Sequence, residues 1–134
     1  MANYTRPGIN YTYIYVYKNH KKTLYTGQTK QDIYSRYRQH IYRNEAGAAQ
    51  ITDIWYFEVP NKFADYIEGY IGVKLNGCNQ CCLPNPNKSK YSMPDKYIMR
   101  QINTIVGILQ NNLPLPKSIK RNLIPLRCLE ITKR

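Results

Sequence analysis

The chain has 134 residues, of which 43% are hydrophobic, and its 20 Lys and Arg against 8 Asp and Glu give a formal net charge of +12. This length is typical of a single domain with its own core, and the apolar content argues against a disordered basic tail. There is no apolar run of transmembrane length and no secretory signal. We therefore expect an intracellular, cytoplasmic protein that is neither secreted nor membrane-bound.

The charge is unevenly divided along the chain. Residues 1–43 carry a net +7, residues 44–87 a net −3 and residues 88–134 a net +8. Solvated surface charge is the ordinary fate of Lys and Arg, but +12 on so small a domain exceeds what solubility requires. The balance indicates a polyanionic partner, with nucleic acid the first choice and an anionic membrane surface the second.

The N-terminal part predicts a β-hairpin. Residues 11–17 are β-branched or aromatic throughout, which is typical of a strand whose odd-numbered Tyr share one face. A polar turn then leads to a second short strand over residues 23–26, which Gly27 ends. Pairing about His20 would place Tyr15 opposite Tyr25.

Helices and strands alternate through the rest of the chain. A helix is predicted from an N-cap at Thr29 to about Arg43, with Arg36 and His40 one turn apart on it. Its apolar stripe comprises Ile33, Tyr37 and Ile41. The further predicted elements are a strand over 51–59, a helix over 63–75, a loop over 76–93, a helix begun by Pro94 and ending near Gln110, a helical turn over 118–123 and a last strand over 127–132.

The four cysteines permit two interpretations. Cys78-x-x-Cys81 has the spacing of a zinc ligand pair, and Cys82 with Cys128 would complete four thiolates for a structural zinc. Free, half-buried thiols are the simpler interpretation. Disulfides are not expected in a reducing compartment.

Five side chains together can supply what phosphodiester hydrolysis requires. Arg36 offers a planar fork of donors for phosphate oxygens, and Glu68 is a suitable ligand for a hard cation such as Mg²⁺. Beside Arg36 or His40, the phenolate of Tyr15 or Tyr25 would be favoured and could act as a general base. Taken singly, each residue has an ordinary interpretation, strand packing for the Tyr and solvated surface for the others.

The order and spacing of these residues resemble the GIY-YIG nuclease family over about residues 11–87. The motifs are Tyr13-Ile14-Tyr15, Tyr25-Thr26-Gly27, Arg36-x-x-x-His40 and Glu68 on a later helix. Tyr13 and Thr26 depart from the Gly and Ile of the family motifs. The resemblance implies a small α/β (α+β) domain, residues 1–90, whose three-stranded antiparallel sheet is flanked by helices. Residues 91–134 would then be a basic C-terminal helical extension packed on the same domain.

The resemblance also implies a role for each residue of the motifs. Tyr15 would be the general base or position the water, Tyr25 would position the base or substrate, and Arg36 would bind phosphate. His40 would share proton transfer, and Glu68 would hold a single Mg²⁺ or Mn²⁺. The supporting residues would be Gly27 and a downstream Asn, for which Asn85 is preferred to Asn87.

The expected function is that of a metal-dependent DNA endonuclease, a hydrolase that acts on double-stranded or branched DNA, with a homodimer as one way to cut both strands. The basic residues expected to contact nucleic acid are Lys18, Lys22, Lys30, Arg38, Lys117, Lys120 and Arg121. One alternative is a non-catalytic nucleic-acid-binding module on the same fold. Another is an accessory protein on an RNA or protein assembly, with zinc bound by the cysteines.

Overall fold

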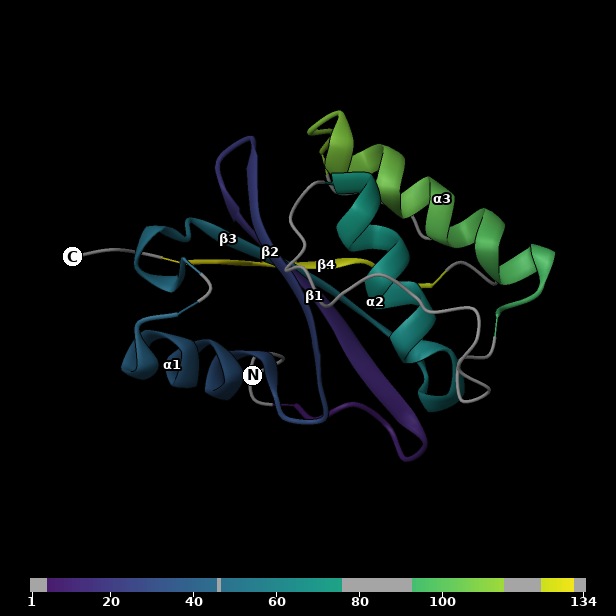
Figure 1. Ribbon diagram of the computed structural model, residues 1–134, viewed down its shortest axis with the longest axis horizontal. Coiled ribbons are helices and arrows are strands. Elements are labelled where there is room, and N and C mark those ends of the chain that lie inside the picture. The colour runs from purple at the N-terminus through teal and green to yellow at the C-terminus, as the bar shows by residue number, and fades with distance from the viewer. Residues whose placement is uncertain (1–4, 46, 76–92, 115–123, 132–134) are drawn as a thin grey trace.

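A four-stranded antiparallel sheet lies at the centre of this computed structural model, which describes residues 5–45, 47–75, 93–114 and 124–131 (Figure 1). The strands are β1 (Tyr11–Asn19), β2 (Lys22–Thr29), β3 (Asp53–Pro60) and β4 (Arg127–Glu130), in the order β2-β1-β3-β4. The α+β fold is confirmed, with one strand more than the three implied by the family resemblance, because β4 pairs with the outer edge of β3.

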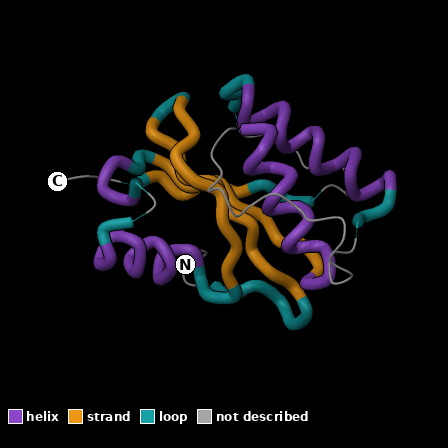
Figure 2. The backbone as a smooth tube through the Cα atoms, viewed as in Figure 1, coloured by secondary structure: helices purple, strands orange, loops and turns teal. Residues whose placement is uncertain are grey.

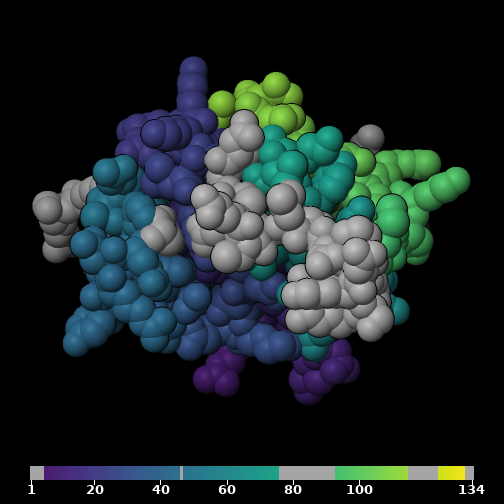
Figure 3. Space-filling model, viewed as in Figure 1, coloured from purple at the N-terminus to yellow at the C-terminus, as the bar shows by residue number. Residues whose placement is uncertain are grey.

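Helices cover both faces of the sheet (Figure 2). The helices are α1 (Ile33–Arg43), the short 3₁₀ helix η2 (Ala48–Gln50), α2 (Asn61–Leu75) and α3 (Lys96–Gln110). On the surface, α1 and α3 lie at opposite sides of the molecule (Figure 3). No helix of the described ranges is long and apolar enough to cross a membrane.

Strand β1 supplies side chains to two cores. Tyr13, Tyr15 and Tyr17 are buried on the face covered by α1, whereas Ile14 and Val16 are buried on the face covered by α2 and α3. This alternation confirms the predicted split between Tyr on one face and β-branched residues on the other. Because β1 is buried on both faces, it forms the middle layer of the fold.

The register of the hairpin differs from the prediction. Strand β2 continues through Gly27 to Thr29, and Tyr15 pairs with Gly27 while Tyr17 pairs with Tyr25. There are two causes. The turn consists of His20, whose φ is 53°, and Lys21, between the paired Asn19 and Lys22, and Leu24 of β2 has no partner between the pairs Tyr17–Tyr25 and Lys18–Thr23. The predicted opposition of Tyr15 and Tyr25 is therefore wrong, and Tyr15 faces a residue without a side chain.

The first helix also begins later than predicted. Thr29 lies in β2, and the N-cap of α1 is Asp32, whose carboxylate accepts a hydrogen bond from Ser35 N at 2.9 Å. Ile41 of the predicted apolar stripe is 42% exposed, whereas His40 is buried. The helix therefore directs the imidazole ring of His40 toward the sheet, whereas the periodicity of apolar residues had predicted that Ile41 would be buried there.

The later elements agree closely with the predictions. Strand β3 and helix α2 correspond to the strand and helix predicted there, and α3 begins after an Asp95 N-cap, one residue beyond Pro94. Helices α2 and α3 pack together over Ile14, Val16 and Phe57 in one core. The loop predicted over 76–93, apart from Met93, and the helical turn predicted over 118–123 lie outside the described residues.

Lys18 is not a surface residue, so its predicted role in binding nucleic acid is wrong. It is 2% exposed, and its ammonium group donates to Leu109 O at 2.8 Å and to Asn112 Oδ1 at 2.7 Å. Burial lowers its pKa, with the charge of Asp53 opposing the shift. The side chain instead joins β1 to the C-terminal end of α3, where a cation is favoured.

Replacing Lys18 should destabilise the fold. We expect Lys18→Met to lower the free energy of unfolding by about 1–3 kcal/mol, because the change leaves the Leu109 carbonyl and the Asn112 amide without their buried donor. Urea denaturation measures this, with Lys21→Met in the exposed turn as the control. An unchanged midpoint for Lys18→Met would show that the contact is not needed for stability.

Candidate active site

The aromatic core under α1 brings together three of the five predicted catalytic residues. The Tyr15 hydroxyl lies 2.9 Å from Nε2 of His40, within hydrogen-bonding distance in a buried setting. The ring of Tyr25 lies 6.2 Å from that of Tyr15 and 5.5 Å from that of His40, measured between centroids. Strands β1 and β2 and helix α1 each contribute one member of this group.

Gly27 is required because the Tyr15 ring lies against its backbone. A Cβ atom at this position would be 2.5 Å from the Tyr15 hydroxyl oxygen and 2.6 Å from its Cζ. It would also be 2.8 Å from Cε2 of Tyr25. Any larger residue would therefore push the phenol away from His40. The supporting role expected of Gly27 has this steric reason.

Adding one methyl group at Gly27 should disrupt the site. We expect Gly27→Ala to lower the stability by about 1–3 kcal/mol through overpacking and to displace Tyr15. Thermal denaturation measures the loss. Gly107→Ala is the matched control, since a Cβ there meets nothing within 4 Å in helix α3, and it should stabilise by about 0.5–1 kcal/mol. Equal effects of the two changes would contradict the steric account.

Arg36 brings positive charge to the same group. It precedes His40 by one turn of α1, and its Nη1 donates to Gln39 Oε1 at 3.0 Å. Burial lowers the pKa of Arg36, but the hydrogen bond to Tyr15 and the neighbouring Tyr together raise it above its ordinary value. The guanidinium group therefore stays protonated. Its buried Nε has no hydrogen-bond partner among the described residues.

Tyr15 itself is a neutral phenol. Burial raises its pKa above the ordinary value, and the hydrogen bond from Arg36 opposes this shift only in part. The expectation that neighbouring cations would favour the Tyr15 phenolate is therefore wrong, because the side chain is 1% exposed and desolvation dominates. Any proton that leaves Tyr15 needs an acceptor in direct contact, and His40 is that contact.

His40 is suited to accept a proton. It is 2% exposed, and burial, followed by the charge of Arg36, lowers its pKa below the ordinary value, against the opposing charge of Glu45. The ring is therefore uncharged at neutral pH and keeps a lone pair available.

Glu45 is a member of the group that the sequence analysis missed. Its Oε1 lies 3.2 Å from Nδ1 of His40, and Arg43 Nη1 lies 4.0 Å from the same oxygen. A usable signal was present in Asn44, a residue type that often ends a helix in the left-handed conformation and so reverses the chain. Asn44 adopts that conformation with φ 51°.

Glu68 approaches β2 from the other face of the sheet. It is half-buried on α2, and Nε2 of Gln28 donates to its Oε1 at 2.6 Å and to Asp65 Oδ1 at 2.7 Å. Gln28 follows Gly27 in β2, so neighbouring residues of this edge strand contact Glu68 on one side and Tyr15 on the other. The charge of Glu68 also contributes to the raised pKa of Tyr15.

The residues around Glu68 fit a hard divalent cation. Two carboxylate oxygens, from Glu68 and Asp65, converge on one Gln28 amide nitrogen. Mg²⁺ and Mn²⁺ take oxygen ligands, and Mg²⁺ commonly uses one or two carboxylates together with water and phosphate oxygens. Within the described ranges there is no group of three or more His, Cys, Asp or Glu arranged for a metal. Of the described residues, Glu68 and Asp65 would supply the ligands, with water and phosphate oxygens at other positions.

The predicted zinc set cannot be assembled from the described residues. Cys128 of β4 is half-buried with a free thiol, and burial raises its pKa to about 12. Cys78, Cys81 and Cys82 lie outside the described residues, as do Asn85 and Asn87.

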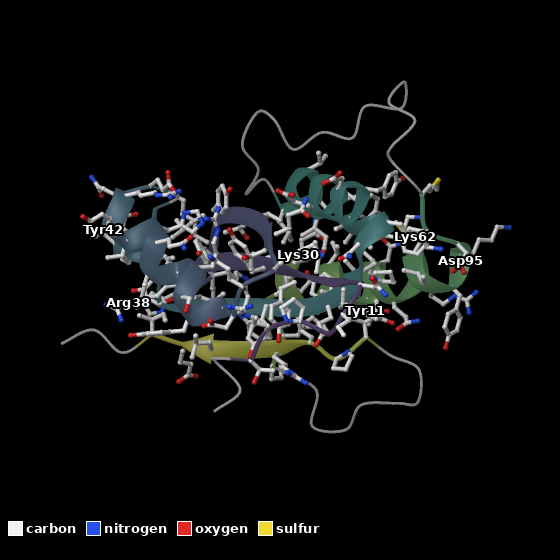
Figure 4. All side chains as sticks on the ribbon, turned by 90° about the horizontal axis from the view of Figure 1, so that it is seen from below. Tyr11, Lys30, Arg38, Tyr42, Lys62 and Asp95 are labelled. Carbon is white, nitrogen blue, oxygen red and sulfur yellow. The ribbon has the colours of Figure 1, made fainter. Side chains whose placement is uncertain are left out.

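The basic residues expected to contact nucleic acid divide into three groups. Lys22, Lys30 and Arg38 are exposed as predicted, and Lys30 also donates to Asn61 Oδ1 at 2.7 Å. Figure 4 shows Arg38 on the α1 side of the molecule and Lys30 nearer its middle. Lys18 is buried, as described above. Lys117, Lys120 and Arg121 lie outside the described residues.

Neither a family model, nor a curated protein, nor a solved structure matches this chain. The assignment of a function therefore depends on the geometry of the site and on the motif resemblance.

Proposed function

We propose that this protein is a metal-dependent endonuclease of the GIY-YIG type that hydrolyses DNA phosphodiester bonds. The observation that supports this most directly is the 2.9 Å contact between the Tyr15 hydroxyl and Nε2 of His40, formed against Gly27 and beside Arg36. A phenol in contact with an uncharged imidazole, beside a permanently charged guanidinium, can supply a general base for water and a cation for a phosphate.

The buried and half-buried members of the site have different tasks. Tyr15 and His40 are almost fully buried, whereas Tyr25 and Arg36 are half-buried and more accessible to a phosphate. Arg36 binds a phosphate oxygen through its planar donors and stabilises the charge that develops there. Tyr25 orients the substrate beside the Tyr15 ring.

Tyr15 and His40 move the proton. Because the resting Tyr15 is a neutral phenol, it cannot serve as the base alone; it passes its own proton to Nε2 of His40 as it takes one from the attacking water. His40 becomes the imidazolium, and the hydroxide forms a bond to phosphorus as the bond to the leaving oxygen breaks. His40 is therefore the final base of the pair.

Glu68 holds the divalent cation in this proposal, with its carboxylate oriented by Gln28. When bound, Mg²⁺ or Mn²⁺ supplies positive charge to the phosphate and to the leaving oxygen. The exposed Lys22, Lys30 and Arg38 contact backbone phosphates without reading sequence. Cutting both strands would require a second copy of the chain or two successive nicks.

The site can be tested by cleavage of supercoiled plasmid with Mg²⁺. We expect Tyr15→Phe and Glu68→Gln each to reduce the cleavage rate by about 10²-fold or more, since each removes a group that takes part in the reaction. Tyr56→Phe is the matched control, because Tyr56 pairs with Tyr15 on the same buried face but lies outside the proposed site.

Two outcomes of this assay would contradict the proposal. Equal cleavage by the wild type and Glu68→Gln would exclude Glu68 as the metal ligand. Salt-dependent binding of DNA by the wild type without cleavage of any substrate would instead indicate the non-catalytic module on the same fold.

The pH dependence of cleavage should reflect His40. Its pKa in the folded protein lies below the ordinary value of about 6.5, so the base is uncharged at pH 7 and above and is lost as the pH falls. We expect a rate that changes little between about pH 7 and 8 and declines at lower pH, with a midpoint below about 6.5. Single-turnover rates at saturating protein measure this, and a midpoint above 6.5 would be inconsistent with His40 as the base.

A further inference from the structure

The buried His40 ring lies between two oxygen atoms. Its Nε2 is 2.9 Å from the Tyr15 hydroxyl, and its Nδ1 is 3.2 Å from Oε1 of Glu45. The Glu45 contact is close but falls short of good hydrogen-bond geometry, and among the described residues the buried Nδ1 has no other partner. Tyr15, His40 and Glu45 therefore form a chain of two contacts that leads from the buried core to the partly exposed Glu45.

We infer that Glu45 is a positioning residue, which holds the proton of His40 on Nδ1 so that Nε2 faces Tyr15 as an acceptor. This inference rests on the proposed function for its catalytic meaning. The arrangement follows the logic by which a carboxylate orients the base of a hydrolase triad, with a phenol in place of the usual nucleophile.

The backbone after α1 places Glu45 for this contact. Asn44 in the left-handed conformation reverses the chain, and its amide donates to Ile41 O at 3.1 Å. The Glu45 amide then donates to His40 O at 3.1 Å, and its carbonyl accepts from Ala48 N at 3.1 Å. Both the amide and the carbonyl of Glu45 are therefore hydrogen-bonded, which fixes its backbone next to the last turn of the helix.

Helix stability alone does not explain a carboxylate at this position. The C-terminal end of a helix carries partial negative charge and favours Lys, Arg or protonated His. Apart from Asp32, Glu45 is the only acidic residue in the first 52 positions of the sequence. Glu45 therefore lies at an unfavourable end of the helix, but its carboxylate is close to the buried His40 ring. Stabilising the charged form of that ring would explain its position.

The groups that surround His40 show what the carboxylate must offset. Arg36 and Arg43 of α1 disfavour a charged ring, whereas Glu45 favours it. Among the described residues, the aromatic rings next to His40 are those of Tyr15, Tyr17 and Tyr25. When Nε2 takes the Tyr15 proton, the ring carries a proton on each nitrogen and a positive charge, and Nδ1 is the nitrogen 3.2 Å from the Glu45 carboxylate. The Tyr15 oxygen is reprotonated by the attacking water, so the net change is one proton moved from water to His40. His40 returns to its uncharged form by releasing that proton to the departing oxygen, directly or through solvent.

The test begins with the tautomer of His40, measured by ¹⁵N–¹H correlation spectra of labelled histidine without DNA or metal. We expect the Nδ1–H form in the wild type. Glu45→Gln, which keeps an acceptor without the charge, should give a mixed tautomer and a lower His40 titration midpoint. Glu45→Leu should shift both further. The chain has one other histidine, the exposed His20, which serves as an internal reference.

The control is Glu130→Gln, which neutralises an exposed glutamate on β4 and should leave the His40 signals unchanged. In the plasmid assay, Glu45→Leu should lower the rate at least about tenfold, with Glu45→Gln in between. The same tautomer and titration in the wild type and both Glu45 variants would overturn the inference. A shift of the tautomer in a protein that cleaves nothing would support the positioning of His40 and reject the nuclease.

Discussion

The Tyr15 ring lies so close to the backbone of β2 that a single added carbon at Gly27 would fall 2.5 Å from its hydroxyl oxygen. This approach fixes the position of the phenol, and the phenol in turn positions His40 through their 2.9 Å contact. It depends on the hairpin register, since only the pairing of Tyr15 with Gly27 leaves space for the ring. Sheet geometry and proposed chemistry are therefore set by the same contact.

Strand β2 joins the two halves of the candidate site because it is an edge strand. The Tyr15 and His40 pair lies under α1 on one face, and the Glu68 and Gln28 pair lies beside α2 on the other. An edge strand can be approached around its side, so a phosphate held there could contact groups from both faces. The Tyr15 and His40 pair, proposed to accept the proton, is buried and uncharged, whereas the part around Glu68, proposed to bind the cation, is polar and half-buried. The sheet thus separates two electrostatic environments by one strand.

Local patterns in the sequence predicted most of the fold. The alternation in β1 and the periodicity of α2 and α3 depend on neighbouring residues, and the structure confirms them. The register of Tyr15 was missed because the turn includes Lys21 as well as His20 and because the unpaired Leu24 of β2 moves every pair beyond it. Lys18 was missed because its partner Leu109 is distant in sequence, and Glu45 because its role depends on the reversal at Asn44. The phenolate of Tyr15 was wrongly favoured, since a count of nearby cations does not include the cost of burial.

The contact of Lys18 with the end of α3 has a consequence for the order in which the chain can fold. The ammonium group and the carbonyl that accepts its hydrogen bond are separated by 91 positions in the sequence. During synthesis, the hairpin and α2 exist before this acceptor has been made, and until then the charge of Lys18 has no dry environment that suits it. The ammonium group of Lys18 therefore stays hydrated until Leu109 and Asn112 have been synthesised and can accept its hydrogen bonds. Helix α3 shares a core with β1, β3 and α2, so the N-terminal part cannot reach its final packing until α3 has been synthesised.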